Sequence, residues 1–423
     1  IKPDVVITAV EATSGIDTTN AASTVFTLSG GVPVTGTGTW DPTGLVYTFV
    51  PDGDLNETDT YTATMDAKDN AGNSATQLTF TFQVDVQKPT IDNLAPTSGA
   101  WVTTATPTVS AQIHDEANGS AIKESTIVTT VDTVTVTHVY VDPTVTFTIG
   151  SLGEGEHTAT VDVSDNAGNA ATQASWTFKV DTVAPVLSKT SPIDWANVIK
   201  PNVVITAVEA TSGLDEITTN FTLTGSVTGN IVGSGGWTGL VYTFVPTNNL
   251  SENETYTAPM DVDDNAGNSA TQLSFTFEVD VTPPVINDAS WNPGEGSWIN
   301  AAAVDLTVEV TDTAGSGVDL TSAVVDHTGV GAVGVLAYDS ITHQLTIPLG
   351  GLGEGAHTIT LDIDDAAGNH AVQQSVTFNV DTVEPTEPTA VTAPDPTNDT
   401  TPTFEWSGAT DPDPRSGIAN YTV

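Results

Sequence analysis

The chain lacks cysteine entirely and contains few basic residues. Without thiols, no disulfide stabilises its domains and no thiolate serves as a nucleophile or a metal ligand. Lysine and arginine total 8 residues, whereas aspartate and glutamate total 53, which gives a formal net charge of −45. Nucleic-acid binding and electrostatic attachment to anionic lipid both require basic surfaces. The composition therefore argues against both functions. No apolar run reaches the roughly 18 residues expected of a membrane-spanning helix, so we expect no membrane insertion in this segment.

A five-residue motif, Asp-Asn-Ala-Gly-Asn, recurs along the chain. It occupies residues 69–73, 165–169 and 264–268, and a copy with Ala366 in second place occupies residues 365–369. The copies start 96, 99 and 101 residues apart (165−69, 264−165 and 365−264). Sixteen residues after the first Asp of each copy, a Val-Asp pair closes, and a proline follows four residues later. These closing residues are Asp85, Asp181, Asp280 and Asp381. A unit repeated near a hundred residues predicts a tandem array of small domains.

The repeat fixes the expected domain boundaries. We place four domains at residues 1–85, 86–181, 182–280 and 281–381, and the incomplete start of a fifth, different domain of immunoglobulin or fibronectin type III kind at residues 382–423. Residues 1–17 nearly repeat at 199–215, but about eighteen residues precede the later copy after Asp181. The first domain is therefore expected to lack its first strand. Either the chain is cropped from a longer protein, which we favour, or a neighbouring molecule supplies the strand by β-augmentation.

Short runs with two-residue alternation predict β-strands throughout. In the first domain these runs are residues 5–10, 45–50, 61–67 and 76–84, and clusters of Gly, Pro, Asn and Asp separate them. No segment shows a sustained helical period. About seven such strands per hundred residues predict an all-β chain, namely a linear tandem array of immunoglobulin-like antiparallel β-sandwich domains. Four domains of about 40 Å each then predict a rod on the order of 160 Å long.

Three features together resemble a known family. They are the Asp-Asn-Ala-Gly-Asn motif before a final strand, the Ser-Gly-Ile/Leu-Asp loop at residues 14–17 and 212–215, and the Val-Asp-x-x-x-Pro junction. They resemble the bacterial and archaeal immunoglobulin-like (Big-type) repeats of large cell-surface proteins, and are similar to the calcium-binding extender domains of long adhesins. The resemblance implies this fold and an extracellular or cell-surface location. Ala366 departs from the motif by removing one amide, while Asp365 and Asn369 remain.

Carboxylates are expected to gather where one domain follows another. In such a sandwich, the turn between the last two strands and the loop between the second and third strands lie at the end where the chain enters. The last strand finishes at the opposite end, so the closing Asp of one domain should approach both loops of the next. The expected sets are Asp85 with Asp115, Glu116 and Asp165; Asp181 with Glu209, Asp215 and Asp264; Asp280 with Asp312, Asp319 and Asp365; and Asp381 with Asp411 and Asp413. The equivalent residues of the first domain are Glu11, Asp17 and Asp69, and the outward-facing Asp66, Asp162, Asp261 and Asp362 are candidates to join.

Oxygen ligands gathered without His or Cys are typical of Ca²⁺ sites, which take six to eight oxygens. We therefore expect structural Ca²⁺ to stiffen the junctions. The alternative is that the motif is only a favourable turn, because Asn and Gly tolerate positive φ and Asp accepts hydrogen bonds from nearby amides. In the Gly-Glu-Gly-x-His motif of the second and fourth domains, His157 and His357 are expected to pack or hydrogen-bond at a strand edge. Trp101, Trp195 and Trp298 follow a linker by similar distances, which predicts a shared structural place.

No catalytic constellation is apparent, because the sequence shows no phosphate-binding loop, dinucleotide fingerprint or recurrent Ser-His-Asp context. Carboxylates copied in every domain indicate mechanical or spacing work instead. The sequence thus predicts a non-catalytic extracellular stalk of a cell-surface protein or adhesin, whose partners are neighbouring domains of the same chain. One alternative is a subunit of a self-assembling extracellular filament or surface layer, in which identical chains would be partners. Another is the accessory stalk of an exported carbohydrate-active enzyme.

Overall fold

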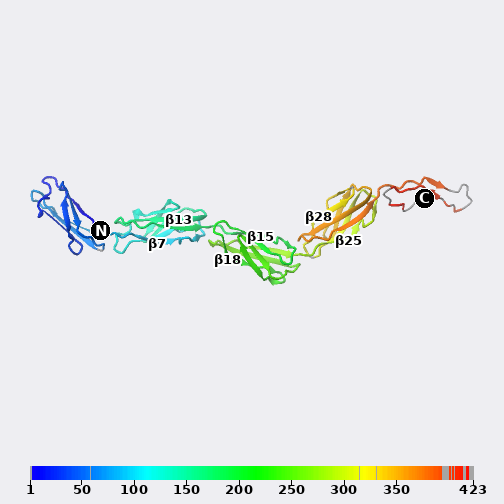
Figure 1. Cartoon of the computed structure of the whole chain (residues 1–423), viewed down its shortest axis with the longest axis horizontal. Helices are drawn as coiled ribbons and strands as arrows, with labels where there is room; N and C mark the ends of the chain where they lie inside the picture. The colour runs from blue at the N-terminus through cyan, green and yellow to red at the C-terminus, as the bar shows by residue number, and fades with distance from the viewer. Residues whose placement is uncertain are drawn as a thin grey trace. The chain divides into compact units, whose positions relative to one another are not determined.

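In a computed structural model of the chain, the regular secondary structure is almost entirely short β-strands, most of them paired antiparallel (Figure 1). It describes residues 2–57, 59–313, 315–329, 331–392, 400–401, 403, 405–412 and 416–418. Within these ranges the one helical element is a 3-10 turn, η1 (Glu124–Thr126). No helix in the described residues is both long enough and apolar enough to cross a membrane. The prediction of an all-β chain is confirmed.

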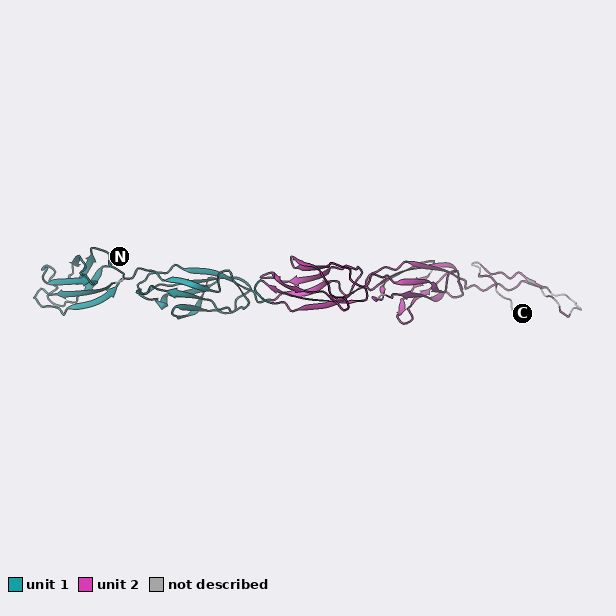
Figure 2. Cartoon of the chain, turned by 90° about the horizontal axis from the view of Figure 1, so that it is seen from below, with its two compact units in different colours: residues 1–183, 265–268 teal, residues 184–264, 269–423 magenta. Residues whose placement is uncertain are grey.

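The chain groups into two compact units, which Figure 2 shows in different colours. The first comprises residues 1–183 and 265–268, and the second comprises residues 184–264 and 269–423. Each unit contains more than one hydrophobic core, and the four cores fall within the four predicted domains. We describe each domain by the predicted range that contains its core.

The first domain, in the first unit, has two three-stranded sheets with the orders β1-β4-β3 and β2-β5-β6. The four predicted strands are present as β1, β4, β5 and β6. Alternation explains the packing, since Tyr61, Ala63, Met65 and Ala67 of β5 all point into the core and the residues between them do not. The strands are β1 (Val5–Thr8), β2 (Thr24–Ser29), β3 (Gly36–Trp40), β4 (Val46–Pro51), β5 (Thr60–Ala67) and β6 (Leu78–Gln83).

The second domain, also in the first unit, joins its two layers into one eight-stranded sheet of order β7-β9-β12-β11-β10-β13-β14-β8. The layers are continuous because β11 is long enough to pair with β10 and with β12 at different points along its length. The strands are β7 (Thr90–Ala95), β8 (Trp101–Val102), β9 (Ser110–His114), β10 (Val128–Val131), β11 (Val134–Val141), β12 (Thr144–Thr148), β13 (Gly155–Asp162) and β14 (Ala174–Val180).

The third domain, in the second unit, has sheets of order β15-β17-β22-β21 and β16-β24-β23-β19-β20, with β18 also paired to β23. Its β17 and β24 correspond to β1 and β6 of the first domain, and β15 and β16 cover their outer edges. The described part of the first domain has no strand in either place, and the expected loss of its first strand stays a prediction. The strands are β15 (Val186–Ser191), β16 (Trp195–Ala196), β17 (Val203–Val208), β18 (Leu214–Phe221), β19 (Thr224–Gly225), β20 (Gly229–Asn230), β21 (Gly233–Thr238), β22 (Val241–Pro246), β23 (Thr255–Asp264) and β24 (Leu273–Val279).

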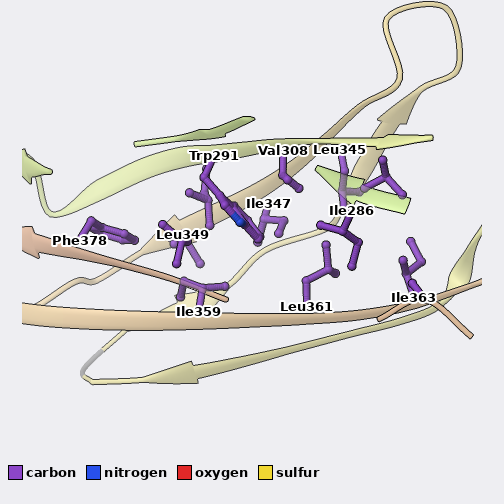
Figure 3. Close-up of a cluster of buried hydrophobic side chains, with 14 of the residues drawn as sticks. Ile286, Trp291, Val308, Leu345, Ile347, Leu349, Ile359, Leu361, Ile363 and Phe378 are labelled. Carbon is purple, nitrogen blue, oxygen red and sulfur yellow. The ribbon is translucent and has the colours of Figure 1, made fainter. Parts of the chain in front are cut away.

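The fourth domain shows how the sandwich core is built (Figure 3). Ile286, Val308 and Ile347 on one layer face Leu361 and Phe378 on the other, and all are buried. The layers have the orders β25-β27-β31-β29, with β30 paired to β31, and β26-β33-β32-β28. The strands are β25 (Val285–Asn292), β26 (Trp298–Ile299), β27 (Ala303–Thr311), β28 (Val318–Thr328), β29 (Ala332–Val333), β30 (Ala337–Asp339), β31 (Gln344–Gly350), β32 (Gly355–Asp365) and β33 (Gln374–Val380). Beyond it, β34 (Ala390–Thr392) pairs with β35 (Glu405–Ser407).

The three tryptophans that follow linkers occupy one shared place, as predicted. Each begins a two-residue strand that runs parallel to the last strand of its own domain. Trp101 lies opposite Lys179, Trp195 opposite Glu278 and Trp298 opposite Asn379. These short strands hold the start of each domain against its end.

A glycine-rich edge strand makes room for an aromatic ring in the third domain. A Cβ atom added at Gly235 of β21 would lie 1.9 Å from the Tyr242 hydroxyl, whereas one added at the neighbouring Gly236 meets nothing within 4 Å. Tyr242 is buried and also packs edge-on against Trp237, at 5.4 Å between ring centroids. The ring therefore lies across the strand where only glycine leaves space.

We predict that Gly235→Ala lowers the free energy of unfolding of the third domain by about 1–3 kcal/mol, because the ring of Tyr242 must shift within a packed core. Gly236→Ala is the matched control on the same strand and should change it by less than about 0.5 kcal/mol. Hydrogen exchange of the β21 and β22 amides measures both. Equal effects of the two substitutions would show that the ring contact is unimportant.

Candidate metal centres at the domain junctions

The repeated motif forms a similar tight turn at residues 69–73, 165–169 and 365–369. In the second domain, Asp165 is fully buried and its Oδ1 accepts the backbone N–H groups of Gly168 (2.7 Å) and Asn169 (2.8 Å). Gly168 has a φ of 95°, which glycine adopts without strain. The altered copy keeps this arrangement, since Asp365 Oδ1 accepts the N–H of Asn369 at 2.8 Å. Local turn chemistry is therefore part of the motif's role.

The last Asn of the motif also reaches the linker from the preceding domain. Asn169 Nδ2 donates to Asp165 Oδ2 (2.7 Å) and to the backbone oxygen of Asp85 (3.1 Å). The same amide bond to a closing aspartate recurs at 2.9 Å from Asn268 to Asp181, both grouped with the first unit, and at 2.9 Å from Asn369 to Asp280 in the second. The motif is thus a junction element as well as a turn.

The carboxylate of the closing aspartate spans the junction as well. Oδ2 of Asp85 accepts the backbone N–H of Ser120 at 2.7 Å, and Oδ2 of Asp280 accepts that of Ser316 at 3.0 Å. Oδ2 of Asp381 accepts the N–H of Ser416 at 3.1 Å. The other oxygen of each carboxylate accepts an amide two residues further along its own linker. One aspartate therefore fixes the linker and contacts a loop of the next domain.

Three carboxylates converge at the junction inside the first unit. One oxygen each of Asp85, Asp115 and Glu116 lies within 4.8 Å of the other two. Both carboxylate oxygens of Asp115 are buried and have no hydrogen-bond partner. Burial and the neighbouring carboxylates of Asp115 and Asp85 together raise the pKa of Glu116 to about 7. Buried carboxylates without partners are costly unless a cation joins them.

The second unit repeats the arrangement with a more deeply buried set. One oxygen each of Asp280, Asp312 and Asp365 lies within 4.8 Å of the other two, and Asp280 and Asp365 are at most 1% exposed. Burial raises the pKa of Asp365, and the charges of Asp280 and Asp312 raise it further. Asp312 Oδ2 accepts the N–H of Gly317 at 2.6 Å, which orients its carboxylate.

The start of the predicted fifth domain carries part of the same site. Asp411 is buried, and its Oδ2 accepts the N–H of Gly417 at 2.6 Å, as Asp312 does from Gly317. Its Oδ1 is buried without a hydrogen-bond partner. Asp413, the other residue predicted here, lies outside the described residues.

Four predicted ligands are instead engaged by glutamines. Each is the Asp three residues before a turn, and its Oδ2 accepts the side-chain amide of the Gln eleven residues later. The pairs are Asp66 with Gln77 (2.8 Å), Asp162 with Gln173 (2.6 Å), Asp261 with Gln272 (2.8 Å) and Asp362 with Gln373 (2.5 Å). Each pair links the strand before the turn to the residue that precedes the last strand. The ligand role of the four Asp residues stays a prediction.

Other predicted ligands accept a hydrogen bond from the residue two positions further along the chain. The acceptors and donors are Glu11 from Thr13, Asp17 from Thr19, Asp69 from Ala71, Glu209 from Thr211, Asp215 from Ile217 and Asp319 from Thr321, in each case from a backbone N–H. Asp181 belongs to the first unit, and Glu209 and Asp264 belong to the second. The metal site expected of those three residues stays a prediction.

Glutamate side chains also accept hydrogen bonds from the linker backbone, which the sequence patterns did not predict. We call these contacts glutamate clamps. Glu154 accepts the N–H of Thr182 at 2.9 Å, and Glu354 accepts the N–H of Thr382 at 3.0 Å. In the second unit, Glu252 accepts the N–H of Val281 at 2.9 Å. A signal was present, because the Glu of the Gly-Glu-Gly motif precedes the linker Thr by 28 residues in both copies (182−154 and 382−354).

We predict that Asn369→Ala lowers the free energy of unfolding of the fourth domain by about 1–3 kcal/mol, because it leaves a buried Asp365 oxygen unpaired. It should also speed hydrogen exchange of the adjoining linker, residues 281–284, since the bond to Asp280 is lost. Asn73→Ala is the matched control, because the Asn73 amide bonds to Asp69 in an exposed turn. Linker exchange unchanged by Asn369→Ala would contradict the junction role of this amide.

Comparison with known proteins agrees with this architecture. A family model described as a bacterial Ig-like domain matches residues 5–84 and 181–279. No curated protein sequence matches the chain.

Several solved structures are similar to the chain. The fibronectin(III)-like modules of Clostridium thermocellum CbhA are 14% identical, with a TM-score of 0.27, over 45% of this chain and 94% of that one. Invasin, a bacterial integrin-binding protein, is 12% identical, with a TM-score of 0.35, over 90% of this chain and 76% of that one. The S-layer protein SbsC is 15% identical, with a TM-score of 0.21, over 93% of this chain and 54% of that one. On the family match and the sandwich topology, the chain is a tandem array of immunoglobulin-like domains, two of which, at residues 5–84 and 181–279, match the bacterial Ig-like domain model.

Proposed function

We propose that this chain is a non-catalytic stalk segment of an extracellular or cell-surface protein, and that Ca²⁺ bound by the junction carboxylates holds successive domains in a fixed relation. The observation that carries the proposal is the buried Asp115 carboxylate, which has no hydrogen-bond partner and lies against Asp85 and Glu116. A chain that folds with such a group needs something to compensate its charge.

The donor set suits calcium. It consists of carboxylate oxygens without His or Cys, which favours hard cations over zinc or copper. Carboxylates bind Ca²⁺ through one or two oxygens, and water and backbone oxygens supply the remainder of its six to eight ligands. Asp85, Asp115 and Glu116 would hold the ion in the first unit, and Asp280, Asp312 and Asp365 would hold it in the second.

Such an ion would act across the junction. Asp85 and Asp280 end one domain, whereas the other ligands of each set belong to loops of the next domain. The ion would add to the Asn and Ser hydrogen bonds that already cross the same joints. It would also relieve the repulsion between carboxylates in a chain with 45 excess negative charges.

The repetition of the site supports a structural role. Equivalent carboxylate clusters occur at a junction in each unit, whereas a catalytic centre needs one constellation beside a substrate site. Tandem Ig-like domains with a carboxylate cluster at a junction in each unit suit a spacer outside the cell, where calcium is abundant.

We predict that Ca²⁺ at a hundredfold excess over its Kd raises the free energy of unfolding of the second domain by about 2.7 kcal/mol. Asp115→Asn should abolish most of this gain while leaving the gain of the fourth domain intact. Asp312→Asn should give the reverse pattern. Hydrogen exchange of β13 and β32 in the full chain, with calcium and with chelator, measures the two domains separately.

Asp288→Asn is the control, because it removes the same charge from an exposed position on β25. It should leave both calcium effects unchanged. Calcium effects of equal size in Asp115→Asn and in the unmodified chain would rule out this site as the binding centre.

A further inference from the structure

The second and fourth domains place a buried histidine at the same point but give it opposite partners. In the second domain His157, on β13, is 8% exposed. Its Nε2 lies 2.9 Å from the backbone oxygen of Gly153, and its Nδ1 lies 2.7 Å from Oδ2 of Asp132. Both partners are acceptors, so both ring nitrogens carry protons and His157 is an imidazolium paired with a carboxylate. Although burial opposes the charge, Asp132 and Gly153 raise the pKa of His157 above its usual range.

In the fourth domain the partner is another histidine. His357, on β32, is 2% exposed, and its Nε2 lies 2.7 Å from the backbone oxygen of Gly353. Its Nδ1 lies 3.0 Å from Nε2 of His327 on β28. Because Nε2 donates to Gly353, Nδ1 is the acceptor in the neutral ring, and His327 is the donor. The contact therefore exists only while Nδ1 of His357 carries no proton.

The pair has room for one added proton but not for two. A first proton placed on His327 Nδ1 leaves the hydrogen bond to His357 intact. A second proton would have to go to His357 Nδ1, where it would face the N–H of His327 and set two charges side by side. In the unfolded chain both rings take up protons freely below about pH 6.5. Folding of this domain therefore excludes at least one proton that the unfolded chain binds.

We propose that the fourth domain is an acid-sensitive element of the array, in which protonation of the His327–His357 pair weakens the fold while the His157–Asp132 pair preserves the second domain.

In the part of the chain that the structure describes, the surroundings of the pair supply no compensating charge. Phe378 of β33 stacks on the His357 ring at 5.8 Å between ring centroids. The uncharged Gly331 lies close against the His327 ring, since a Cβ atom added at Gly331 would lie 2.7 Å from it. Glu354, next to Gly353, is held by Thr382, and Asp326 occupies the exposed, opposite face of β28. Burial lowers the pKa of His327, and the charge of His357 lowers it further. Neither ring has a carboxylate partner among the described residues.

The sign of the pH effect follows from these partners. A histidine whose pKa is lowered by folding stabilises the fold above about pH 6.5 and loses that contribution as the pH falls. A histidine whose pKa is raised contributes below its unfolded pKa and loses the contribution as the pH rises. The fourth domain should therefore weaken between pH 7.5 and 5.5, whereas the second should hold or gain.

The strand registers show which substitution converts one pair into the other. In the second domain Val131 lies opposite Ala159, and the N–H of Thr158 donates to Asp132. In the fourth domain His327 lies opposite Ile359, and Thr328 lies opposite Thr358. His327 and Thr328 thus take the places of Val131 and Asp132. The double variant His327→Val with Thr328→Asp gives the fourth domain the ion pair of the second.

The test is hydrogen exchange of the full chain at pH 7.5 and 5.5 with calcium held constant, corrected for intrinsic exchange rates. Protection of β28 and β32 should fall about tenfold on acidification, the effect expected for one excluded proton, while β10 and β13 keep theirs. The double variant should retain its protection at pH 5.5. An equal fall in the double variant, or no fall in the unmodified chain, would overturn the proposal.

Histidine ring NMR signals provide a readout that does not depend on the variant folding. In the unmodified chain, His327 should titrate below pH 6.5, whereas His157 should titrate above it. Titration of both His327 and His157 near pH 6.5 would contradict the proposal.

Discussion

An asparagine amide that bonds to a backbone oxygen of the preceding linker is the contact on which the described junctions depend. The side-chain amide of Asn169 or Asn369 is oriented by the first Asp of its own turn. It donates a hydrogen bond to the backbone oxygen of Asp85 or Asp280, respectively. Because the same aspartate accepts a serine N–H from the next domain, the linker is held on two sides. This arrangement draws the closing carboxylate toward the acidic loop and so creates the candidate cation site.

The contact explains why the motif has five positions rather than two. A tight turn needs only its glycine and an accepting aspartate, and Ala366 shows that the second position tolerates change. The fifth position is different, because its amide must donate to the turn and to the linker at once. Glutamate clamps on the linker side, such as Glu154 on Thr182, restrict the same segment further. A junction held at several points suits a chain that keeps domains apart rather than one that folds them together.

The sequence predicted the strands, the turns and the gathering of Asp85 with Asp115 and Glu116, because alternation and fixed spacing are enough to place strand ends in a sandwich. It did not distinguish which acidic residues stay free for a cation. Asp319 was expected near Asp280, but it lies at the start of β28 and accepts the N–H of Thr321, a choice set by local backbone conformation that spacing does not encode. The sequence also did not predict His327 as the partner of His357, because His327 lies on β28, a strand whose register the sequence does not specify.

Small-angle X-ray scattering of the chain, in millimolar calcium and then in chelator, tests the central claim most directly. If calcium fixes the junctions, the maximum dimension will be long and constant with the ion, and the scattering will become that of a flexible chain without it. Identical profiles in the two buffers would contradict the account, and the junctions would then be held by the asparagine, serine and glutamate contacts alone.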